Sequence, residues 1–176
     1  MKLKFLIFFI FFSLPLEAHT FTGMIGFYDG VSHPVLGLDH FLAMVSVGVI
    51  SAQIGGRSIW TIPSMFVGMM IIGGFIGMIT ELSMPSLESL FLLIVEYGII
   101  FSVILLGLAI AIEKKLSVKV TIIFISIFGL CHGTAHGMEM PWAANPLLFA
   151  LGFASGTATL HLFGVGIGSL AIKTKF

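Results

Sequence analysis

The chain has 176 residues, of which 58% are hydrophobic and only 9% are charged, and its mean hydropathy is +1.16. Soluble domains carry roughly a quarter charged residues, so this composition excludes a soluble globular protein and indicates an integral membrane protein. The formal net charge is zero, which gives no sign of nucleic-acid binding, and the single cysteine, Cys131, excludes an intramolecular disulfide and a CxxC metal or redox pair.

The first segment has the pattern of a secretory signal peptide. Two lysines precede an apolar run of roughly 12 residues, and the run ends at Glu-Ala18-His19. We therefore predict a signal peptide at 1–18 that is cleaved after Ala18. Cleavage makes His19 the first residue of the mature chain, where its imidazole and the free amine together can chelate a metal. If the segment is instead retained as an anchor, the protein has six membrane helices rather than five.

Five apolar segments follow a Gly-rich polar stretch at 20–32, and each approaches or exceeds the roughly 20 residues that a spanning helix needs. Short connectors rich in Gly, Pro or charge separate them, so consecutive helices should be antiparallel neighbours. We predict an all-α integral membrane protein, a bundle of five transmembrane helices in one domain at 19–176. The predicted helices lie at about 34–54, 58–80, 88–112, 117–138 and 146–171.

The positions of the charged residues predict the orientation in the membrane. A signal peptide places the mature N-terminus outside, and every Lys and Arg after it then falls in an inside loop or at the C-terminus. The acidic residues Asp29, Glu81, Glu88 and Glu139 fall outside. This distribution agrees with the positive-inside rule, so we expect the mature N-terminus on the outer side of the membrane and the C-terminus in the cytoplasm.

Glycines recur at the spacing that lets membrane helices approach closely. We interpret them as packing positions rather than as functional residues. They are Gly73 and Gly77, Gly152 and Gly156, and the series Gly164, Gly166 and Gly168.

The first cluster of ionisable residues lies at the start of the first predicted helix. Such groups are costly in a bilayer and usually face a bundle interior or an aqueous cavity. His33 and His40 are seven residues apart, so they share one side of a helix. If that helix starts just before Pro34, a favourable first-turn position for proline, His33 lies at its outer mouth and His40 two turns deeper. Asp39 either ligates a metal directly or orients a ligand.

The second cluster lies near the outer end of the fourth predicted helix. His132, His136 and Glu139 have the spacing of one helix face, so one stripe carries three candidate ligands. At about 1.5 Å per residue, both clusters lie roughly 9 Å below the outer face, and we expect them to meet. His161 and Glu96 are candidates for a further station along the path of an ion.

Imidazole and carboxylate ligands without thiolate suit Ni²⁺, Co²⁺, Zn²⁺ or Cu²⁺, and the ligand types alone do not select one of them. Three methionines, Met44, Met138 and Met140, are soft donors that would favour Cu(I), although methionine is also common apolar filling. A purely structural role for the histidines, or for an Asp39–His40 pair, is the alternative interpretation.

These motifs resemble those of the HupE/UreJ family of bacterial nickel permeases, which are associated with hydrogenase and urease maturation. The resemblance extends over nearly the whole chain, from a signal peptide that ends before a histidine to the motif His-Gly-Thr-Ala-His-Gly-Met-Glu. Cys131 departs from the family pattern, which usually has phenylalanine before the first histidine of this motif, and this affects the expected metal selectivity. The resemblance implies functional roles for His33, Asp39, His40, His132, His136 and Glu139.

We therefore expect a permease, not an enzyme, that takes up Ni²⁺ or Co²⁺ as its substrate and needs no prosthetic cofactor. No nucleotide-binding motif is present, so transport should be facilitated diffusion or coupled to an ion gradient. The expected partners are the metal ion and the lipid bilayer, and association between copies of the chain stays open. The alternatives are an intramembrane zinc-dependent hydrolase with Glu139 as base, and a metal sensor that binds without transport.

Overall fold

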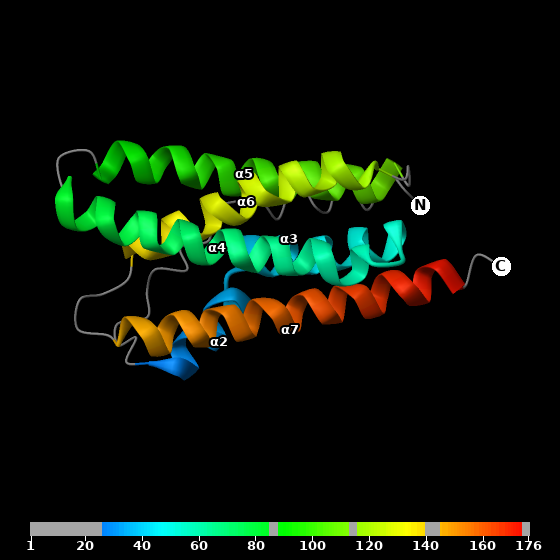
Figure 1. The fold of residues 1–176 in the computed structure, drawn as a ribbon, viewed down its shortest axis with the longest axis horizontal. Coiled ribbons are helices and arrows are strands. Elements are labelled where there is room, and N and C mark those ends of the chain that lie inside the picture. The colour runs from blue at the N-terminus through cyan, green and yellow to red at the C-terminus, as the bar shows by residue number, and fades with distance from the viewer. Residues whose placement is uncertain (1–25, 85–87, 113–115, 140–144, 174–176) are drawn as a thin grey trace.

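The computed structural model describes residues 26–84, 88–112, 116–139 and 145–173, and throughout this part the regular elements are helices (Figure 1). Four of them are long and apolar enough to cross a membrane, and α2 with α3 qualifies as a fifth span if the bent pair counts as one. The prediction of an all-α polytopic membrane protein is confirmed, while the predicted signal peptide at 1–18 lies outside the described residues. The helices are α2 (Phe27–Leu36), α3 (Leu38–Ile54), α4 (Ser58–Ser83), α5 (Glu88–Ile112), α6 (Val118–Glu139) and α7 (Pro146–Lys173).

The prediction of one straight helix at 34–54 is wrong. The chain is already helical from Phe27, and α2 and α3 meet at an angle of 83°. Asp29 explains the early start, because its carboxylate accepts the backbone N–H of Gly26 at 3.0 Å and so caps the first turn. The break occurs at Gly37, whose ψ of 112° is extended rather than helical. Pro34 consequently lies near the end of α2 instead of at the start of a spanning helix.

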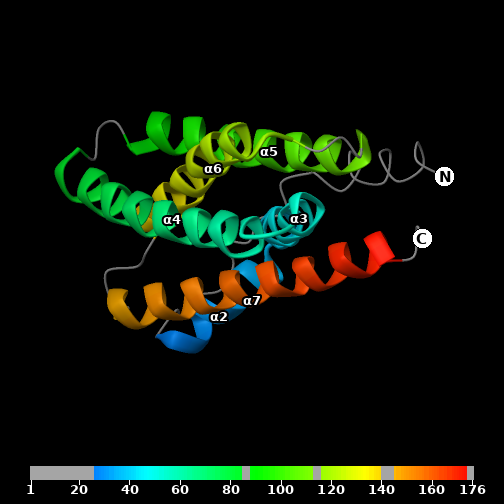
Figure 2. The same cartoon turned by 45° about the vertical axis from the view of Figure 1, so that its right-hand side comes forward.

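The helices form two closely packed sets (Figures 1 and 2). In the first set α4 packs along α6, and α5 lies against α6; in the second set α7 packs along both α2 and α3. Contacts of α3 with α4 and α5, and of α7 with α4, join the two sets. Each cluster of candidate ligands therefore comes from a different set, with α2 and α3 in one and α6 in the other.

Glycines make the helix contacts within each set very close. A Cβ atom on Gly133 of α6 would collide with the Met70 carbonyl oxygen of α4, and one on Gly73 of α4 would collide with the Leu130 carbonyl oxygen of α6. The predicted packing role is confirmed for Gly73, Gly77, Gly152, Gly156, Gly164 and Gly168, and it is wrong for Gly166, around which a Cβ would find open space. Close approach of this kind is how helices associate in lipid, where packing replaces the hydrophobic effect.

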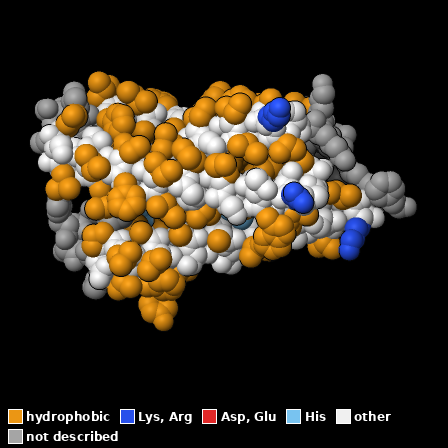
Figure 3. Space-filling view, viewed as in Figure 1, with side chains coloured by type: hydrophobic (Ala, Val, Ile, Leu, Met, Phe, Trp, Pro, Cys, Tyr) orange, Lys and Arg blue, Asp and Glu red, His pale blue; other side chains and the backbone are white. Residues whose placement is uncertain are grey.

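The outer surface is mostly hydrophobic, and Lys and Arg side chains appear near one end of the molecule (Figure 3). Large apolar side chains such as Phe75, Phe101 and Leu162 are more than half exposed. Soluble monomers rarely expose so large a hydrophobic surface. In a membrane this surface would contact the lipid tails. Arg57 precedes α4, and Lys173 ends α7, so these cations mark the same end of two antiparallel helices.

Substituting one glycine tests the close packing of α4 on α6. We expect Gly133→Ala to lower the melting temperature in detergent, because the new methyl group must displace the Met70 backbone, and overpacking costs about 1–3 kcal/mol. Gly68→Ala is the matched control in α4, since a Cβ there meets no atom within 4 Å. Thermal unfolding followed by circular dichroism measures both variants, and equal melting temperatures would contradict the packing described above.

Candidate metal centre

Three buried histidines from three helices meet inside the bundle. His33 of α2, His40 of α3 and His136 of α6 each offer a ring nitrogen, and these nitrogens all lie within 4.8 Å of one another. The ring centroid of His136 is 4.5 Å from that of His33 and 4.5 Å from that of His40. We refer to these residues as the three-histidine group. Three imidazole nitrogens suit a borderline divalent ion and leave further coordination positions open.

The break between α2 and α3 brings His33 and His40 together. On one straight helix their rings would be two turns, or roughly 10 Å, apart, whereas across the break the ring centroids are 5.7 Å apart. Glycine at the break also gives the His40 ring its space, since a Cβ on Gly37 would lie 3.2 Å from His40 Nδ1. The expectation that His33 lies at the mouth and His40 two turns deeper is therefore wrong, because the two residues belong to different helices.

Asp39 lies directly behind His40. Its Oδ1 is 2.6 Å from His40 Nδ1 and also accepts the backbone N–H of His40 at 2.9 Å. An Nδ1–H that donates to this carboxylate leaves the lone pair on Nε2, which is the atom that faces His136. This carboxylate–histidine arrangement is common behind metal ligands, where it fixes the tautomer and the orientation of the ring. Of the two roles expected for Asp39, the geometry favours orientation of a ligand.

The nitrogens of His40 and His136 point at each other. Their Nε2 atoms are 2.5 Å apart in a buried environment. Two imidazole nitrogens that share one ion at about 2.1 Å are roughly 3.4 Å apart in tetrahedral geometry, so binding requires the rings to separate by about 1 Å. An ion shared by these two nitrogens would therefore need only a small movement of the two rings.

His132 and His161 extend the group deeper into the bundle. His132 Nδ1 donates to the Phe128 carbonyl at 2.8 Å, which leaves the lone pair on Nε2, and its ring centroid lies 5.2 Å from that of His40. The Phe66 ring lies 5.4 Å from His132 and 5.2 Å from His161. Neither His132 nor His161 belongs to the three-histidine group, but both are fully buried, and both contact the Phe66 ring.

The remaining candidate metal ligands lie away from the three-histidine group or outside the residues that the structure describes. Glu139 ends α6, and its side chain and all of His19 are outside the description. Glu96 is half-buried on α5 and does not belong to the three-histidine group. A Cβ on Gly98 would lie 2.9 Å from Cys131 Sγ, so the thiol faces α5.

The buried methionines mainly fill the core. Met44 is fully buried in the main hydrophobic cluster together with Val47 and Phe66. Met138 is also buried, and Met140 lies outside the described residues. These surroundings favour packing over copper ligation for Met44.

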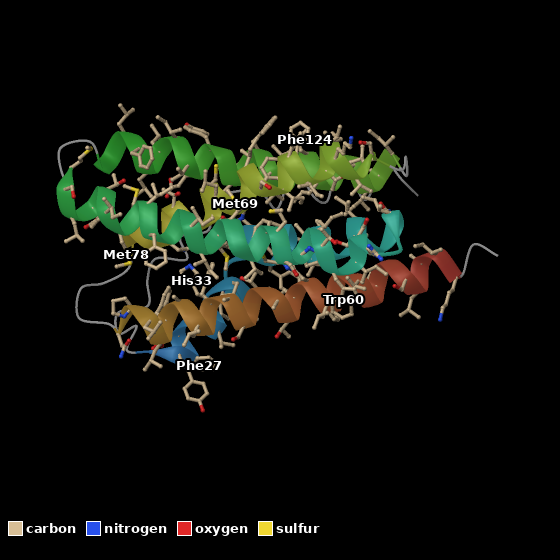
Figure 4. All side chains as sticks on the ribbon, viewed as in Figure 1. Phe27, His33, Trp60, Met69, Met78 and Phe124 are labelled. Carbon is tan, nitrogen blue, oxygen red and sulfur yellow. The ribbon has the colours of Figure 1, made fainter. Side chains whose placement is uncertain are left out.

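The sequence did not predict the aromatic side chains that lie next to the histidines. The Phe153 ring centroid is 4.5 Å from that of His136 and 5.8 Å from that of His33, and Phe149 lies 6.0 Å from His33. Both phenylalanines, together with His136 and Met78, line an apolar groove of about 250 Å³ formed by α4, α6 and α7. In the view of Figure 4 the labelled His33 is drawn between the ribbons of α4 and α7. A phenylalanine in an apolar helix has no distinguishing pattern, so only the folded structure could find these neighbours.

Comparisons with known proteins agree with the sequence motifs. The profile of the family described as HupE / UreJ protein matches residues 7–175. "Protein HupE" of Rhizobium leguminosarum bv. viciae is 39% identical over 160 residues, which cover 90% of this chain and 79% of that protein. No solved structure matches the chain.

Asp39→Asn tests the orienting role of this carboxylate. We expect the affinity of the purified protein for Ni²⁺ to fall about 10- to 100-fold, the usual effect of losing a residue that supports a ligand. Isothermal titration calorimetry measures the affinity. Asp29→Asn is the matched control, because Asp29 caps α2 and its amide replacement can still accept the Gly26 N–H. Equal affinities for Asp39→Asn and the unmodified protein would contradict the role.

Proposed function

Because the chain belongs to the HupE/UreJ family, a family of transporters, we propose that it carries Ni²⁺ or Co²⁺ into the cell by secondary transport without ATP. The observation that supports this proposal best is the three-histidine group, in which ligand atoms from three helices converge inside the membrane bundle. Ionisable and ligating groups at such a place usually mark an ion path.

The chemistry of the group suits transient binding. Imidazole nitrogens can replace several waters of a borderline divalent ion, and Asp39 behind His40 supplies negative charge close to the cation. The Asp39 side chain is partly buried, with 41% of its surface exposed. We propose that Glu139, one turn beyond His136, adds a further carboxylate at the outer entrance, and that His19 of the mature N-terminus is the first residue to meet the ion.

The topology that we propose has a cleaved signal peptide at 1–18, a periplasmic mature N-terminus and a cytoplasmic C-terminus in the inner membrane. The pair α2 and α3 would then be one broken span. Many transporters place their substrate at such discontinuous helices, where the chain bends next to the site. Arg57 and Lys173 at one end of the bundle support the cytoplasmic assignment of that end.

The biological role that we propose is supply of nickel for the maturation of hydrogenase or urease. This follows from family membership and from the nitrogen-rich ligand set, which contains no thiolate in the three-histidine group.

One observation favours a second candidate. The apolar groove that includes His136 would suit an acyl chain or an apolar peptide, as an intramembrane zinc-dependent hydrolase would need. The family membership favours transport, and flux measurements separate the two functions. A metal sensor would bind ions without flux.

Uptake of radioactive Ni²⁺ into proteoliposomes tests the proposed transport. We expect saturable uptake that falls by on the order of tenfold or more in His40→Ala and in His136→Ala, since each change removes a ligand. Ser155→Ala is the control, because Ser155 is exposed on α7 and its hydroxyl donates to the Leu151 carbonyl of its own helix, while the Ser155 carbonyl that accepts from Thr159 is kept in the variant. Tight binding without flux in the unmodified protein would exclude a permease and support the sensor or the hydrolase.

The rate of uptake should also depend on pH. A protonated imidazole has no lone pair for a metal, and histidine ordinarily titrates near pH 6.5, so protons and Ni²⁺ compete for the same nitrogens. We expect the initial rate at constant free Ni²⁺ to fall as the outside pH drops from about 7.5 to about 5.5. The same assay without protein gives the leak at each pH. Uptake that stays constant down to about pH 5 would contradict histidine ligation.

A further inference from the structure

His161 is a buried polar side chain that packing alone does not explain. It lies near the middle of α7 with none of its surface exposed. Within the described part of the chain, neither its Nδ1 nor its Nε2 forms a hydrogen bond. A neutral imidazole always carries one donor and one acceptor, and leaving both unpaired in the interior is unfavourable. A leucine or phenylalanine would fill the same volume without this cost, so the imidazole itself needs an explanation.

A second buried polar side chain lies close to His161 on α7. Thr157 lies one turn earlier on the same face of α7, is fully buried, and its Oγ1 lies 3.7 Å from Met70 Sδ. The His161 ring packs against the Phe66 ring of α4 with the two ring planes at 89° to each other. A Cβ on Gly48 would collide with the His161 carbonyl oxygen, so α3 supports the backbone of α7 at this position. The ring therefore projects from a fixed backbone toward α4.

A row of rings connects His161 to the three-histidine group. Centroid distances along this row are 5.2 Å from His40 to His132, 5.4 Å from His132 to Phe66 and 5.2 Å from Phe66 to His161. The Nε2 of His132 is likewise buried without a hydrogen-bond partner in the described residues. His132, with an available nitrogen, thus follows the group directly, and His161 follows His132 on the far side of the Phe66 ring.

We propose that His161 is a second metal-binding station, which receives a borderline divalent cation such as Ni²⁺ from the three-histidine group by way of His132. The proposal rests on the proposed transport function and extends it. An ion that leaves three ligands for an apolar interior loses much of its stabilisation, and a ligand at the next step reduces this loss. Several sites of moderate strength also let an ion leave as readily as it enters. With few protein donors nearby, the ion at His161 keeps part of its water shell.

Two substitutions at His161 separate ligation from packing. His161→Phe keeps an aromatic ring and removes both nitrogens, whereas His161→Cys loses the ring and supplies a soft ligand. For a metal station we expect the purified unmodified protein to bind two Ni²⁺ per chain after equilibrium dialysis, and the Phe variant to bind one. The Phe variant should lose on the order of tenfold in Ni²⁺ flux in proteoliposomes while its melting temperature stays equal or rises, because an unpaired polar group has been removed.

The Cys variant supplies a readout that does not depend on transport. We expect it to keep the second ion and, with Co²⁺, to gain a near-ultraviolet thiolate-to-metal absorption band. The unmodified protein is the matched control, since it contains only Cys131, whose thiol faces α5. Absence of this band together with unchanged Ni²⁺ stoichiometry in the Phe variant would overturn the proposal and assign His161 to packing or to a bound water.

The outcomes also separate this proposal from the proposed function. If the unmodified protein neither binds nor transports Ni²⁺, both are overturned. If it transports Ni²⁺ and the Phe variant transports equally well, only the second station is overturned. Reduced flux with unchanged stoichiometry in the Phe variant likewise overturns the station, because it shows that the ring affects flux without holding an ion.

Discussion

Close backbone contact between helices is the constraint on which the rest of the structure depends. Where Gly133 faces Met70 and Gly73 faces Leu130, no side chain separates α4 from α6. Glycines of α3 and α7 produce the same closeness in the second set, as at Gly48 against the His161 backbone. In lipid, such contact supplies the van der Waals packing that holds helices together. It also determines which side chains on the remaining faces can meet.

The three-histidine group joins the two sets of helices. His33 and His40 belong to the set packed on α7, whereas His136 belongs to α6, which is packed on α4. An ion held by all three nitrogens would therefore contact both sets at once. Within each set the glycine contacts leave little freedom for the helices to slide, so any change in the distances between these ligands depends on the contacts between the sets. The geometry of an ion bound at this group would thus be coupled to the packing of the bundle.

Two buried histidines of this bundle are each oriented by a hydrogen bond at one of their two ring nitrogens. A buried imidazole is expensive unless its nitrogens have partners, and the chain places several in one region. Two of them have their tautomer fixed from behind, His40 by the Asp39 carboxylate and His132 by the Phe128 carbonyl. In both cases the hydrogen bond engages Nδ1 and leaves Nε2 available. This repeated use of Nδ1 for orientation is what a set of metal ligands requires.

The sequence by itself determined the membrane class, the limits of the last four helices to within a few residues, and the two ligand clusters, because apolar length and helical spacing are local properties. It did not determine the break at Gly37, since the 83° bend depends on α2 packing against α7 as well as on a local glycine. This bend places the His33 ring next to the His40 ring. Nor did the sequence reveal that Phe66 lies between His132 and His161, because contacts between helices distant in the chain arise only when their faces pack in three dimensions.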